Sequence, residues 1–382
     1  MKTLQTLVIG GGQAGLAMGW HLAQRQIDFL ILEASDRSGG AWRSYYDSLE
    51  LFSPAGYSAL PGLPFPGPQG RYPHRDEVVA YLDDYARRFR LPVRTGEKVV
   101  NVVRNGDGFE AVTASGQRYH ARTLIAASGA FGMPYVPAIE GQERFRGRIL
   151  HSAEYLNSKD FLGSSIVVVG GANSAVQIAT ELAGVARVKL ATLQPIRFFP
   201  QRILGLDFHF WMKWTGLEQT RWLNDQSTPV LDSGRYSHAI KTGRVQRQEM
   251  FTRITAHGVV WPDGTEEQVD VLLFATGFRP NATYLQELGA VSADNRLAQQ
   301  NGIAQATPGL YFVGFPRQRN FASATLRGVG ADAAHIMPHL LAYLHKNDQE
   351  TGHMSTASAS TDHVGSIALI QDQPPRSGSE IS

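Results

Sequence analysis

Glycines and one carboxylate near the start of the chain form the first group of residues with a clear chemical use. Residues 10–15 read Gly-Gly-Gly-Gln-Ala-Gly and satisfy the pattern G-x-G-x-x-G, and Glu33 follows 18 residues after Gly15. Such glycines permit a tight turn, the approach of a pyrophosphate and close helix packing, while the carboxylate accepts hydrogen bonds from ribose hydroxyls. A glycine-rich turn without function would not explain the carboxylate. We therefore predict a dinucleotide site that contains Gly10, Gly12, Gln13, Ala14, Gly15 and Glu33.

A strand–helix–strand unit has to position these residues. Residues 6–10 are a short apolar run ended by glycine, which is typical of a buried parallel strand. Residues 14–24 carry apolar side chains at helical spacing, and residues 29–33 read as a second buried strand. The N-terminus of the helix then offers free N–H donors to the phosphates of a ligand.

The same plan recurs about 160 residues later. Residues 165–170 predict a strand, residues 174–183 a helix and residues 188–192 another strand. The turn between the first strand and the helix reads Gly-Gly-Ala-Asn-Ser-Ala from Gly170 to Ala175. Alanine at the second glycine place predicts that the pyrophosphate lies slightly farther from the backbone than in the first unit.

The residues after the last of these strands bear on the choice between NADH and NADPH. An acidic side chain there favours the free 2′-hydroxyl of NADH, and arginine favours the 2′-phosphate of NADPH. Gln194 is neither acidic nor basic, and Arg197 follows shortly after it. We predict relaxed use of both cofactors, at a nicotinamide site formed by Gly170, Asn173, Ser174, Gln194 and Thr276.

Further segments are predicted to complete the first site. Residues 39–43 read Gly-Gly-Ala-Trp-Arg and suit a loop folded over the cofactor, although Trp42 could instead fill the core. Residues 124–129 and 272–277 are apolar strands ending in glycine, which lets the backbone pass close to a ligand or cross between domains. A helix that follows Thr325 can direct its N-terminal dipole at the cofactor. The residues added to the first site are Gly40, Ala41, Trp42, Arg43, Val100, Gly129 and Thr325.

Composition narrows the class of protein. The chain has 382 residues, 43% hydrophobic and 18% charged, with a formal net charge of +2, which is typical of a globular protein of two domains. Without a run of basic residues, we expect no nucleic-acid partner. No stretch approaches the ~20 apolar residues of a membrane span. The first predicted strand leaves no room for a signal peptide, so we expect no membrane association and a cytoplasmic location.

The absence of cysteine excludes several chemistries. Without thiols the chain cannot form disulfides, thiolate metal sites or the redox-active cysteine pair of disulfide reductases. His335 and His339 are four residues apart, but Pro338 is expected to break the helix between them, so we predict no metal site.

Two segments stand apart from the predicted domains. Residues 194–244 are rich in aromatic side chains, among them Phe198, Trp211, Trp214 and Trp222. We expect this insertion to cover a site or to meet a partner subunit in a homodimer. Residues 347–382 carry few large apolar groups and are expected to form a disordered tail.

A segment between the two units connects the chain to a known family. Residues 145–155 match the fingerprint F-x-G-x-x-x-H-x-x-x-(Y/F/W) through Phe145, Gly147, His151 and Tyr155. With both glycine motifs and the Gly-Gly-x-Trp loop, residues 6–345 resemble the class B flavin-dependent monooxygenases, the flavin-containing monooxygenase family of small bacterial type. The resemblance implies an α/β fold of two doubly wound, Rossmann-like domains, the second inserted in the first. FAD would bind residues 1–150 and 278–346, and NADPH or NADH would bind residues 151–277.

The resemblance also implies a reaction. In this family NADPH reduces FAD, the reduced flavin reacts with O2 at C4a, and the hydroperoxide transfers one oxygen to a small sulfide or amine. His151 would support the domain linker without taking part in the chemistry. Many members carry an asparagine near the flavin where this chain has Phe52 or Ser53. We therefore expect appreciable release of H2O2. Because Tyr155 ends the fingerprint where dedicated ketone oxygenases have tryptophan, oxidation of sulfur or nitrogen is favoured over ketones.

Two other readings stay open. The chain could be an NAD(P)H oxidase or flavin reductase that passes electrons to O2 or a quinone without oxygenating an organic substrate, and Phe52 at the asparagine place keeps this option. It could also be a regulatory protein that binds dinucleotides without turnover. The complete second strand–helix frame, with Asn173 and Ser174, argues against that option.

Overall fold

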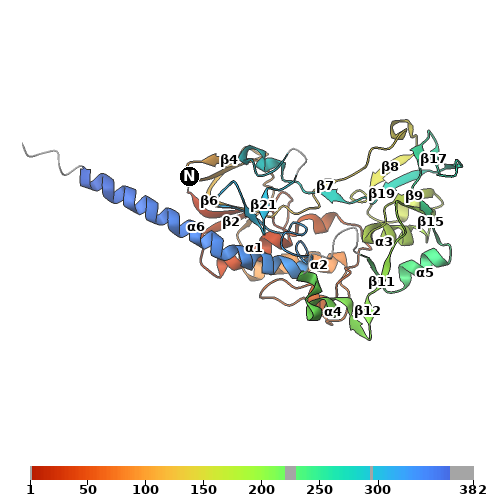
Figure 1. Ribbon diagram of the computed structural model, residues 1–382, viewed down its shortest axis with the longest axis horizontal. Helices are drawn as coiled ribbons and strands as arrows, with labels where there is room; N and C mark the ends of the chain where they lie inside the picture. Colours follow the sequence, from red (N-terminus) through yellow and green to blue (C-terminus); the bar gives the residue numbers. More distant parts are fainter. Residues whose placement is uncertain (1, 220–228, 293–295, 362–382) are drawn as a thin grey trace, which may run out of the picture.

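Two sheets, one of nine strands and one of five, form the framework of the molecule. The computed structural model describes residues 2–219, 229–292 and 296–361. The nine-stranded sheet and the long helix α6 lie towards one end of the molecule, and the five-stranded sheet lies at the other end (Figure 1).

The nine-stranded sheet is built from both ends of the chain. Its main path runs β21-β22-β23-β6-β1-β2-β3, and the β4–β5 hairpin joins it through β6. Strand β1 is parallel to both β2 and β6, so that the predicted first βαβ unit is confirmed at the centre of the sheet. The strands are β1 (Leu4–Ile9), β2 (Phe29–Leu32), β3 (Val93–Arg94), β4 (Val99–Asn105), β5 (Gly108–Thr113), β6 (Arg118–Ala126), β21 (Gln299–Gln300), β22 (Ile303–Ala304) and β23 (Leu310–Phe312).

Three helices accompany this sheet: α1 (Gln13–Ala23), α2 (Arg75–Arg88) and α6 (Leu326–Thr361). Helix α1 packs against α6, and their apolar faces share one core with the strands. Fully buried members of this core are Val8, Leu16, Ile31, Tyr85, Val329, Ile336 and Leu340. Burial of such side chains stabilises the fold by about 1.5–3 kcal/mol each and fixes the start of α1 beside that of α6.

The five-stranded sheet is inserted in the chain between β6 and β21 of the first sheet. Its order is β15-β10-β9-β19-β8, and every neighbouring pair is parallel. Its elements are β8 (Arg148–His151), β9 (Ser165–Val169), α3 (Asn173–Leu182), β10 (Arg187–Thr192), α5 (Arg235–Lys241), β15 (Val245–Glu249) and β19 (Val271–Phe274). The chain leaves and re-enters the first sheet through β7 (Met133–Pro134) and β20 (Phe278–Arg279), which pair antiparallel. Two Rossmann-like units, the second inserted in the first, are thereby confirmed.

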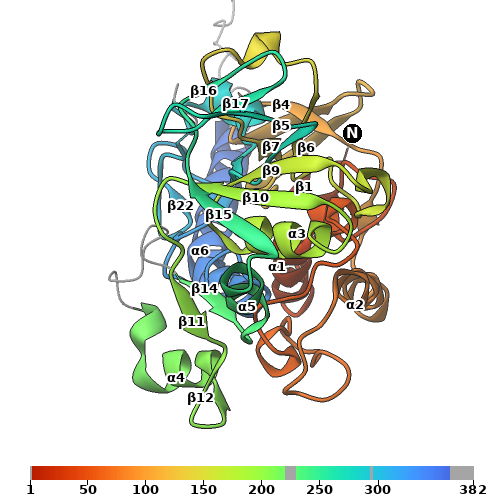
Figure 2. The ribbon, with the colours of Figure 1, turned by 90° about the vertical axis from the view of Figure 1, so that its right-hand side faces the viewer.

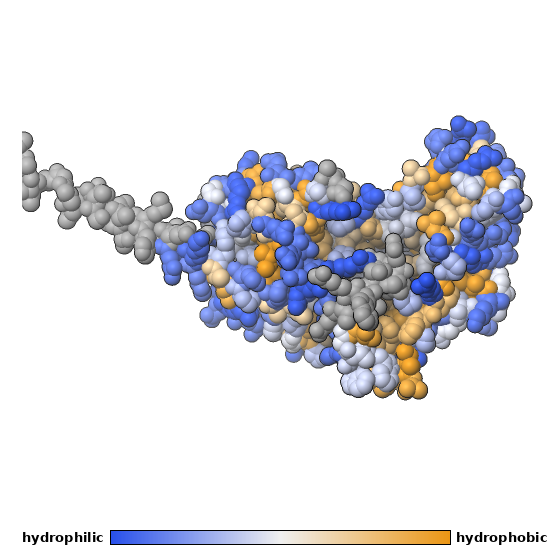
Figure 3. Space-filling view, in the orientation of Figure 1, coloured by the Kyte–Doolittle hydropathy of each residue, from blue (hydrophilic) through white to orange (hydrophobic). Residues whose placement is uncertain are grey.

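An insertion follows β10 and extends from the second sheet beside the first. Figure 2 shows its elements β11, β12 and α4 below the five-stranded sheet. Apolar side chains, including Leu204, Leu206 and Trp214, are exposed on it (Figure 3). Its elements are β11 (Phe198–Pro200), β12 (Arg202–Ile203), β13 (Leu206–Asp207), α4 (Phe208–Thr215) and β14 (Val230–Asp232). Trp222, which the sequence also places in this insertion, lies outside the described residues.

Short elements complete the fold. A small antiparallel sheet is formed by β16 (Arg253–Ile254), β17 (Gly258–Val260) and β18 (Glu266–Gln268). Short 3₁₀ helices cover Gly40–Ser44, Ala55–Tyr57, Gln142–Arg144, Lys159–Phe161, Leu217–Gln219 and Thr283–Leu288.

Helix α6 differs from the sequence prediction in two ways. It continues through Pro338, because the proline removes one backbone hydrogen bond while the flanking side chains Ile336 and Leu340 stay fully buried. The helix also runs to Thr361, although disorder was expected from residue 347 on. Extending an existing helix costs far less than nucleating one, so a packed N-terminal half supports a polar continuation. Residues 362–382 of the predicted tail lie outside the described residues.

The continuous helix brings His335 and His339 one turn apart, with ring centroids separated by 5.8 Å. Among the described residues, no three His, Asp or Glu side chains are grouped so that they could hold a metal ion. Across the same part of the chain, every helix is too short or too polar to cross a bilayer.

Candidate functional site

The three glycines of the first turn are not all needed for the same structural reason. Gly10 has φ +112°, and a Cβ atom on it would lie 2.5 Å from the carbonyl oxygen of Ala127. A Cβ atom on Gly15 would lie 1.9 Å from the carbonyl oxygen of Gly10. On Gly12 the nearest atom would be the Gly40 Cα, 3.7 Å away. The first and third glycines are therefore required by backbone packing, whereas the second leaves open space at the N-terminus of α1, as a bound pyrophosphate needs.

Glu33 is buried at the end of β2 and holds this turn. Its Oε2 accepts a hydrogen bond from the Gly11 N–H at 2.6 Å, and its Oε1 accepts from the Ser35 N–H and hydroxyl at 2.9 and 2.8 Å. The carboxylate is thus fixed beside the glycine turn, where a ribose would lie. Val100, half exposed on β4, follows shortly after Glu97, whose N–H donates to the Glu33 carbonyl.

Gln13 connects three segments that the sequence placed separately. Its side-chain N–H donates to the Ala324 carbonyl at 2.6 Å, and its Oε1 accepts from the Trp42 indole N–H at 3.0 Å. Thr325, directly after Ala324, donates through its hydroxyl to the Ala322 carbonyl and precedes α6. The glycine turn, the Trp42 loop and the start of α6 therefore surround one space. The sequence predicted Gln13 as a ligand-binding residue, and its bridging role carried no sequence signal.

The loop after Gly39 is anchored on α2. Arg43 forms an ion pair with Asp83, and its Nε donates to the Ser38 carbonyl at 2.9 Å. The Ala41 carbonyl accepts from the Ser44 hydroxyl at 2.9 Å. Trp42 is only partly buried against the core, so it closes the loop while keeping one side free. Gly40, with φ +56°, lies against Gly12.

Gly129 follows the end of β6, and the turn around Phe52 lies against helix α4. Gly129 has φ +72° after β6, and nothing lies within 4 Å of the place its Cβ would take. Ser53 is buried and shares a hydrogen bond of 3.0 Å with the Ser58 hydroxyl. The Phe52 ring stacks on His209 of α4, with centroids 6.2 Å apart and planes 21° apart. Phe52 is therefore available to a neighbouring ligand, and the Ser53 hydroxyl is already engaged.

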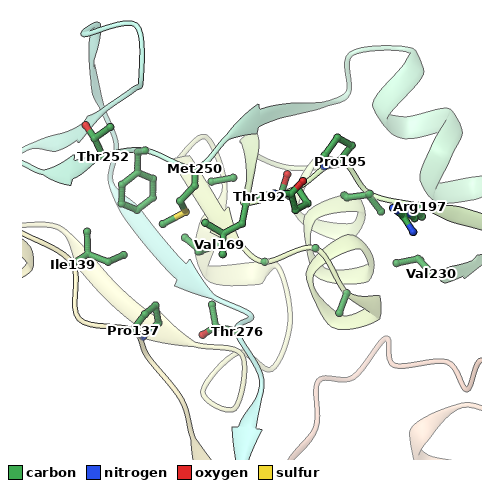
Figure 4. Close-up of a pocket in the computed structure, with 18 of the residues that line it drawn as sticks. Pro137, Ile139, Val169, Thr192, Pro195, Arg197, Val230, Met250, Thr252 and Thr276 are labelled. Carbon is green, nitrogen blue, oxygen red and sulfur yellow. The ribbon is translucent and has the colours of Figure 1, made fainter. Parts of the chain in front are cut away.

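The second glycine turn opens on a pocket of about 900 Å³ (Figure 4). Gly170 has φ +138° and leaves no room for a side chain beside the Ala275 carbonyl, whereas Gly171 is open. Gly170, Gln194, Arg197 and Thr276 all line this pocket. Asn173 and Ser174 begin α3 without lining it. Among the described residues no side chain pairs with the Arg197 guanidinium, which is free for an anionic group.

His151 lies at the hinge between the two sheets. Its Nδ1 accepts from the Ala153 N–H at 3.1 Å, so its Nε2 carries the proton and donates to the Gly277 carbonyl at 2.9 Å. Burial lowers the pKa of His151, which favours this neutral form. The ring meets Phe278 edge-on at 4.9 Å. Thr276 donates to the Tyr135 carbonyl in the other connecting strand. His151 thereby holds the linker, as the resemblance implies.

Sequence reasoning missed a hydrogen-bonded group beside Phe52. Tyr72 and His209 both donate to the carboxylate of Asp207, which lies at the N-terminus of α4. These residues are far apart in the sequence and follow no motif. Only the Asp before an apolar helical stretch, an ordinary N-cap signal, pointed to one of them.

The comparisons with known proteins define the class. A model of the pyridine nucleotide-disulphide oxidoreductase family matches residues 7–202, more than half of the chain. A flavin-containing monooxygenase from Stenotrophomonas maltophilia has 33% sequence identity and a TM-score of 0.81, covering 90% of this chain and 99% of that one. The chain therefore belongs to this oxidoreductase family, among its class B flavin-dependent monooxygenases, and its cofactors are FAD and NAD(P)H.

Individual relatives agree with this assignment. An uncharacterised CzcO-like oxidoreductase of Geobacillus kaustophilus is 33% identical over 88% of this chain and 98% of its own length. The indole-3-pyruvate monooxygenase YUCCA4 of Oryza sativa is 29% identical over 89% of this chain and 88% of its own. The bacillithiol disulfide reductase of Bacillus cereus shares the fold with a TM-score of 0.68 at 19% identity.

Proposed function

We propose that this enzyme uses NAD(P)H and O2 to oxygenate small sulfides or amines, with ketones as secondary substrates. The observation that carries the proposal is the hinge between the two dinucleotide-binding units, where His151 at the end of β8 hydrogen-bonds to the Gly277 carbonyl, in a chain without cysteine. Without a protein thiol, electrons that reach the flavin cannot pass to a redox-active disulfide. Similarity to the Stenotrophomonas monooxygenase over nearly all of its length supports oxygenation as the outcome.

The residues of the first turn would hold FAD. Gly12 would leave space for the pyrophosphate, Glu33 would accept hydrogen bonds from the ribose, and Trp42 and Thr325 would contact the flavin end. Bound FAD supplies the electron transfer between NAD(P)H and O2, and the protein supplies orientation and exclusion of water. The remaining proposed FAD contacts are Gly10, Gln13, Ala14, Gly15, Gly40, Ala41, Arg43, Val100 and Gly129.

The pocket beside the second turn would hold the nicotinamide cofactor. Gln194 can hydrogen-bond to a ribose hydroxyl or to a phosphate, and Arg197 can add charge for the 2′-phosphate. Because strand β8 belongs to the five-stranded sheet, we place the first domain boundary near the β7–β20 crossing, ahead of residue 150.

Phe52 supports a second candidate function, that of an NAD(P)H oxidase. An apolar ring stands where an amide was expected, and Ser53 is bonded to Ser58 and cannot replace the amide. Without that donor, we expect part of the electron flow to end as H2O2.

The test measures NAD(P)H consumed, sulfoxide formed and H2O2 released with methyl phenyl sulfide, for the native enzyme, Phe52→Asn and Phe52→Leu. Sulfoxide formation by the native enzyme, with a larger share in Phe52→Asn and no gain in Phe52→Leu, supports the proposal. H2O2 equal to the NAD(P)H consumed, with no sulfoxide from any of the three, favours the oxidase.

A cytoplasmic location and a homodimer stay predictions from the sequence. The exposed Leu204, Leu206 and Trp214 are the surface we expect to matter if two copies associate.

A further inference from the structure

A hydrogen-bonded chain of three side chains lies outside both dinucleotide turns. The Asp207 carboxylate accepts from the Tyr72 hydroxyl at 2.5 Å through Oδ2, and from the His209 Nδ1 at 2.8 Å through Oδ1. The backbone N–H of His209 also donates to Oδ1, which caps helix α4. Capping alone needs only this last bond. The two side-chain bonds go beyond what capping requires.

The bond to Asp207 fixes the proton arrangement of the imidazole. Burial by itself would raise the pKa of Asp207, but hydrogen bonds from His209 and Tyr72 outweigh it and hold that pKa below its usual value. A carboxylate only accepts, so the proton of neutral His209 sits on Nδ1 and the lone pair sits on Nε2. Within the described residues, Nε2 has no hydrogen-bond partner. His209 is thus built as a base with an unused acceptor.

Aromatic rings surround this base. His209 is 1% exposed, and its ring lies 6.2 Å from Phe52, 6.0 Å from Tyr57 and 5.7 Å from Phe208, centroid to centroid. Faces of aromatic rings attract substituted ammonium groups, and a nearby carboxylate adds to this attraction.

Two basic side chains near this cluster are already engaged. Arg327, which faces Tyr57, forms an ion pair with Glu218, and Arg202 beside Tyr72 donates to the Gly70 carbonyl. Rings, carboxylate and base together have the chemistry of a site for a protonated amine.

We propose that this cluster binds an amine substrate and that His209 removes the proton of its ammonium form. The inference rests on the proposed function, because it assumes that Phe52 lies beside the reacting end of FAD. In the step, the N–H bond of the ammonium breaks, its electron pair stays on the amine nitrogen, and a new N–H bond forms at Nε2. Asp207 compensates the positive charge of the imidazolium, which later returns the proton to water.

Deprotonation matters for one substrate class only. An ammonium nitrogen has no lone pair and cannot take up an oxygen atom, so an amine must lose its proton first. A sulfide already has a free electron pair. His209 is therefore needed as a base for the oxidation of amines but not for the oxidation of sulfides.

The experiment compares kcat/KM for N-methylmorpholine, an amine that titrates near neutral pH, with kcat/KM for methyl phenyl sulfide. The variants are His209→Gln and Asp207→Asn, the latter keeping an oxygen that caps α4. His257→Gln, an exposed histidine in the turn between β16 and β17, is the control. We expect His209→Gln to lower the amine value about a hundredfold, as the loss of a general base does, and the sulfide value less than threefold. Asp207→Asn should likewise lower kcat/KM for the amine more than kcat/KM for the sulfide.

The pH profile separates loss of the base from a packing defect. Below the pKa of the amine, the free-base fraction rises about tenfold per pH unit, so His209→Gln should recover amine oxidation as the pH rises. The other titratable groups packed around the imidazole, Asp207, Tyr57 and Tyr72, are present in that variant too. An equal loss for amine and sulfide at every pH would overturn the proposal.

A binding measurement keeps this inference separate from the proposed function. If the native enzyme forms only H2O2, oxygenation fails, and the oxidised FAD enzyme is then titrated with N-methylmorpholine under 15N NMR observation. A shift of the Nε2 signal towards its protonated value, absent in His209→Gln, supports the amine site. A signal that does not move at saturating amine overturns it.

Discussion

The side-chain amide of Gln13 donates a hydrogen bond of 2.6 Å to the backbone carbonyl of Ala324, 311 positions later in the chain. The same side chain accepts from the Trp42 indole, so one residue joins the glycine turn, the loop above it and the start of α6. Ala324 has φ +69°, an unusual value for a residue with a side chain, which directs its carbonyl towards Gln13. The space that we propose for FAD is thereby closed by segments from both ends of the sequence.

Replacement of Gln13 by Ala should loosen this junction. Two hydrogen bonds are lost, and we expect the free energy of unfolding to fall by about 1–3 kcal/mol and FAD to dissociate more readily. Chemical denaturation and the FAD content after gel filtration measure these effects. Gln117→Ala, on an exposed turn, is the control. Unchanged FAD retention in Gln13→Ala would contradict the role given to this side chain.

The glycine turn could be predicted from sequence because its constraint is local. A strand, three glycines and a helix at fixed spacing leave few conformations, and β1 and α1 begin and end within a few residues of the prediction. The partners of Gln13 could not be predicted in this way, since the Ala324 carbonyl is a backbone group supplied by the tertiary fold.

The substitutions Gly12→Ala and Gly15→Ala should both impair the enzyme, the first through loss of FAD binding and the second through impaired folding. A methyl on Gly12 meets no protein atom closer than 3.7 Å, so the chain should fold and lose FAD. A methyl on Gly15 would lie 1.9 Å from a carbonyl oxygen, so folding itself should suffer. Circular dichroism melting together with flavin absorbance distinguishes the two. Equal thermal stability of the two FAD-free variants would show that the close approach at Gly15 is not needed.

Arg197→Ala should change the choice of cofactor. Loss of a charge-assisted contact to the 2′-phosphate costs about 1.5–3 kcal/mol, so kcat/KM for NADPH should fall about ten- to a hundredfold, with NADH little affected. Steady-state rates with both cofactors measure this effect, and Arg187→Ala, at the far end of β10, serves as control. The native enzyme should accept both, within about a thousandfold, or ~4 kcal/mol. A larger preference of the native enzyme for one of the two cofactors would contradict the predicted relaxed use of NADPH and NADH.

Stability should depend on pH through His151. Because burial lowers its pKa in the folded state, the unfolded chain binds a proton more readily. Its contribution is complete above the ordinary pKa of about 6.5 and is lost as the pH falls through the lower folded value. His151→Gln should remove this part of the acid sensitivity. Urea unfolding between neutral and mildly acidic pH tests it, and parallel curves for native and variant enzymes would contradict the assignment.

The limits of sequence reasoning appear at Pro338 and His209. A proline in a helical pattern predicts a break, but the buried face of α6 outweighs the loss of one hydrogen bond. His209 stands in an insertion with no motif, and its partners Tyr72 and Phe52 come from the first domain. Its environment depends on how the insertion docks, which no local pattern encodes.

The central claim, oxygenation of an organic substrate, is tested most directly with 18O2. The native enzyme is supplied with NADPH and methyl phenyl sulfide, and the product is analysed by mass spectrometry alongside a peroxide assay. We predict sulfoxide carrying one 18O atom, in the presence of catalase, with H2O2 as a by-product in its absence. Unchanged sulfide, with H2O2 equal to the NADPH consumed, would contradict the account and identify an oxidase.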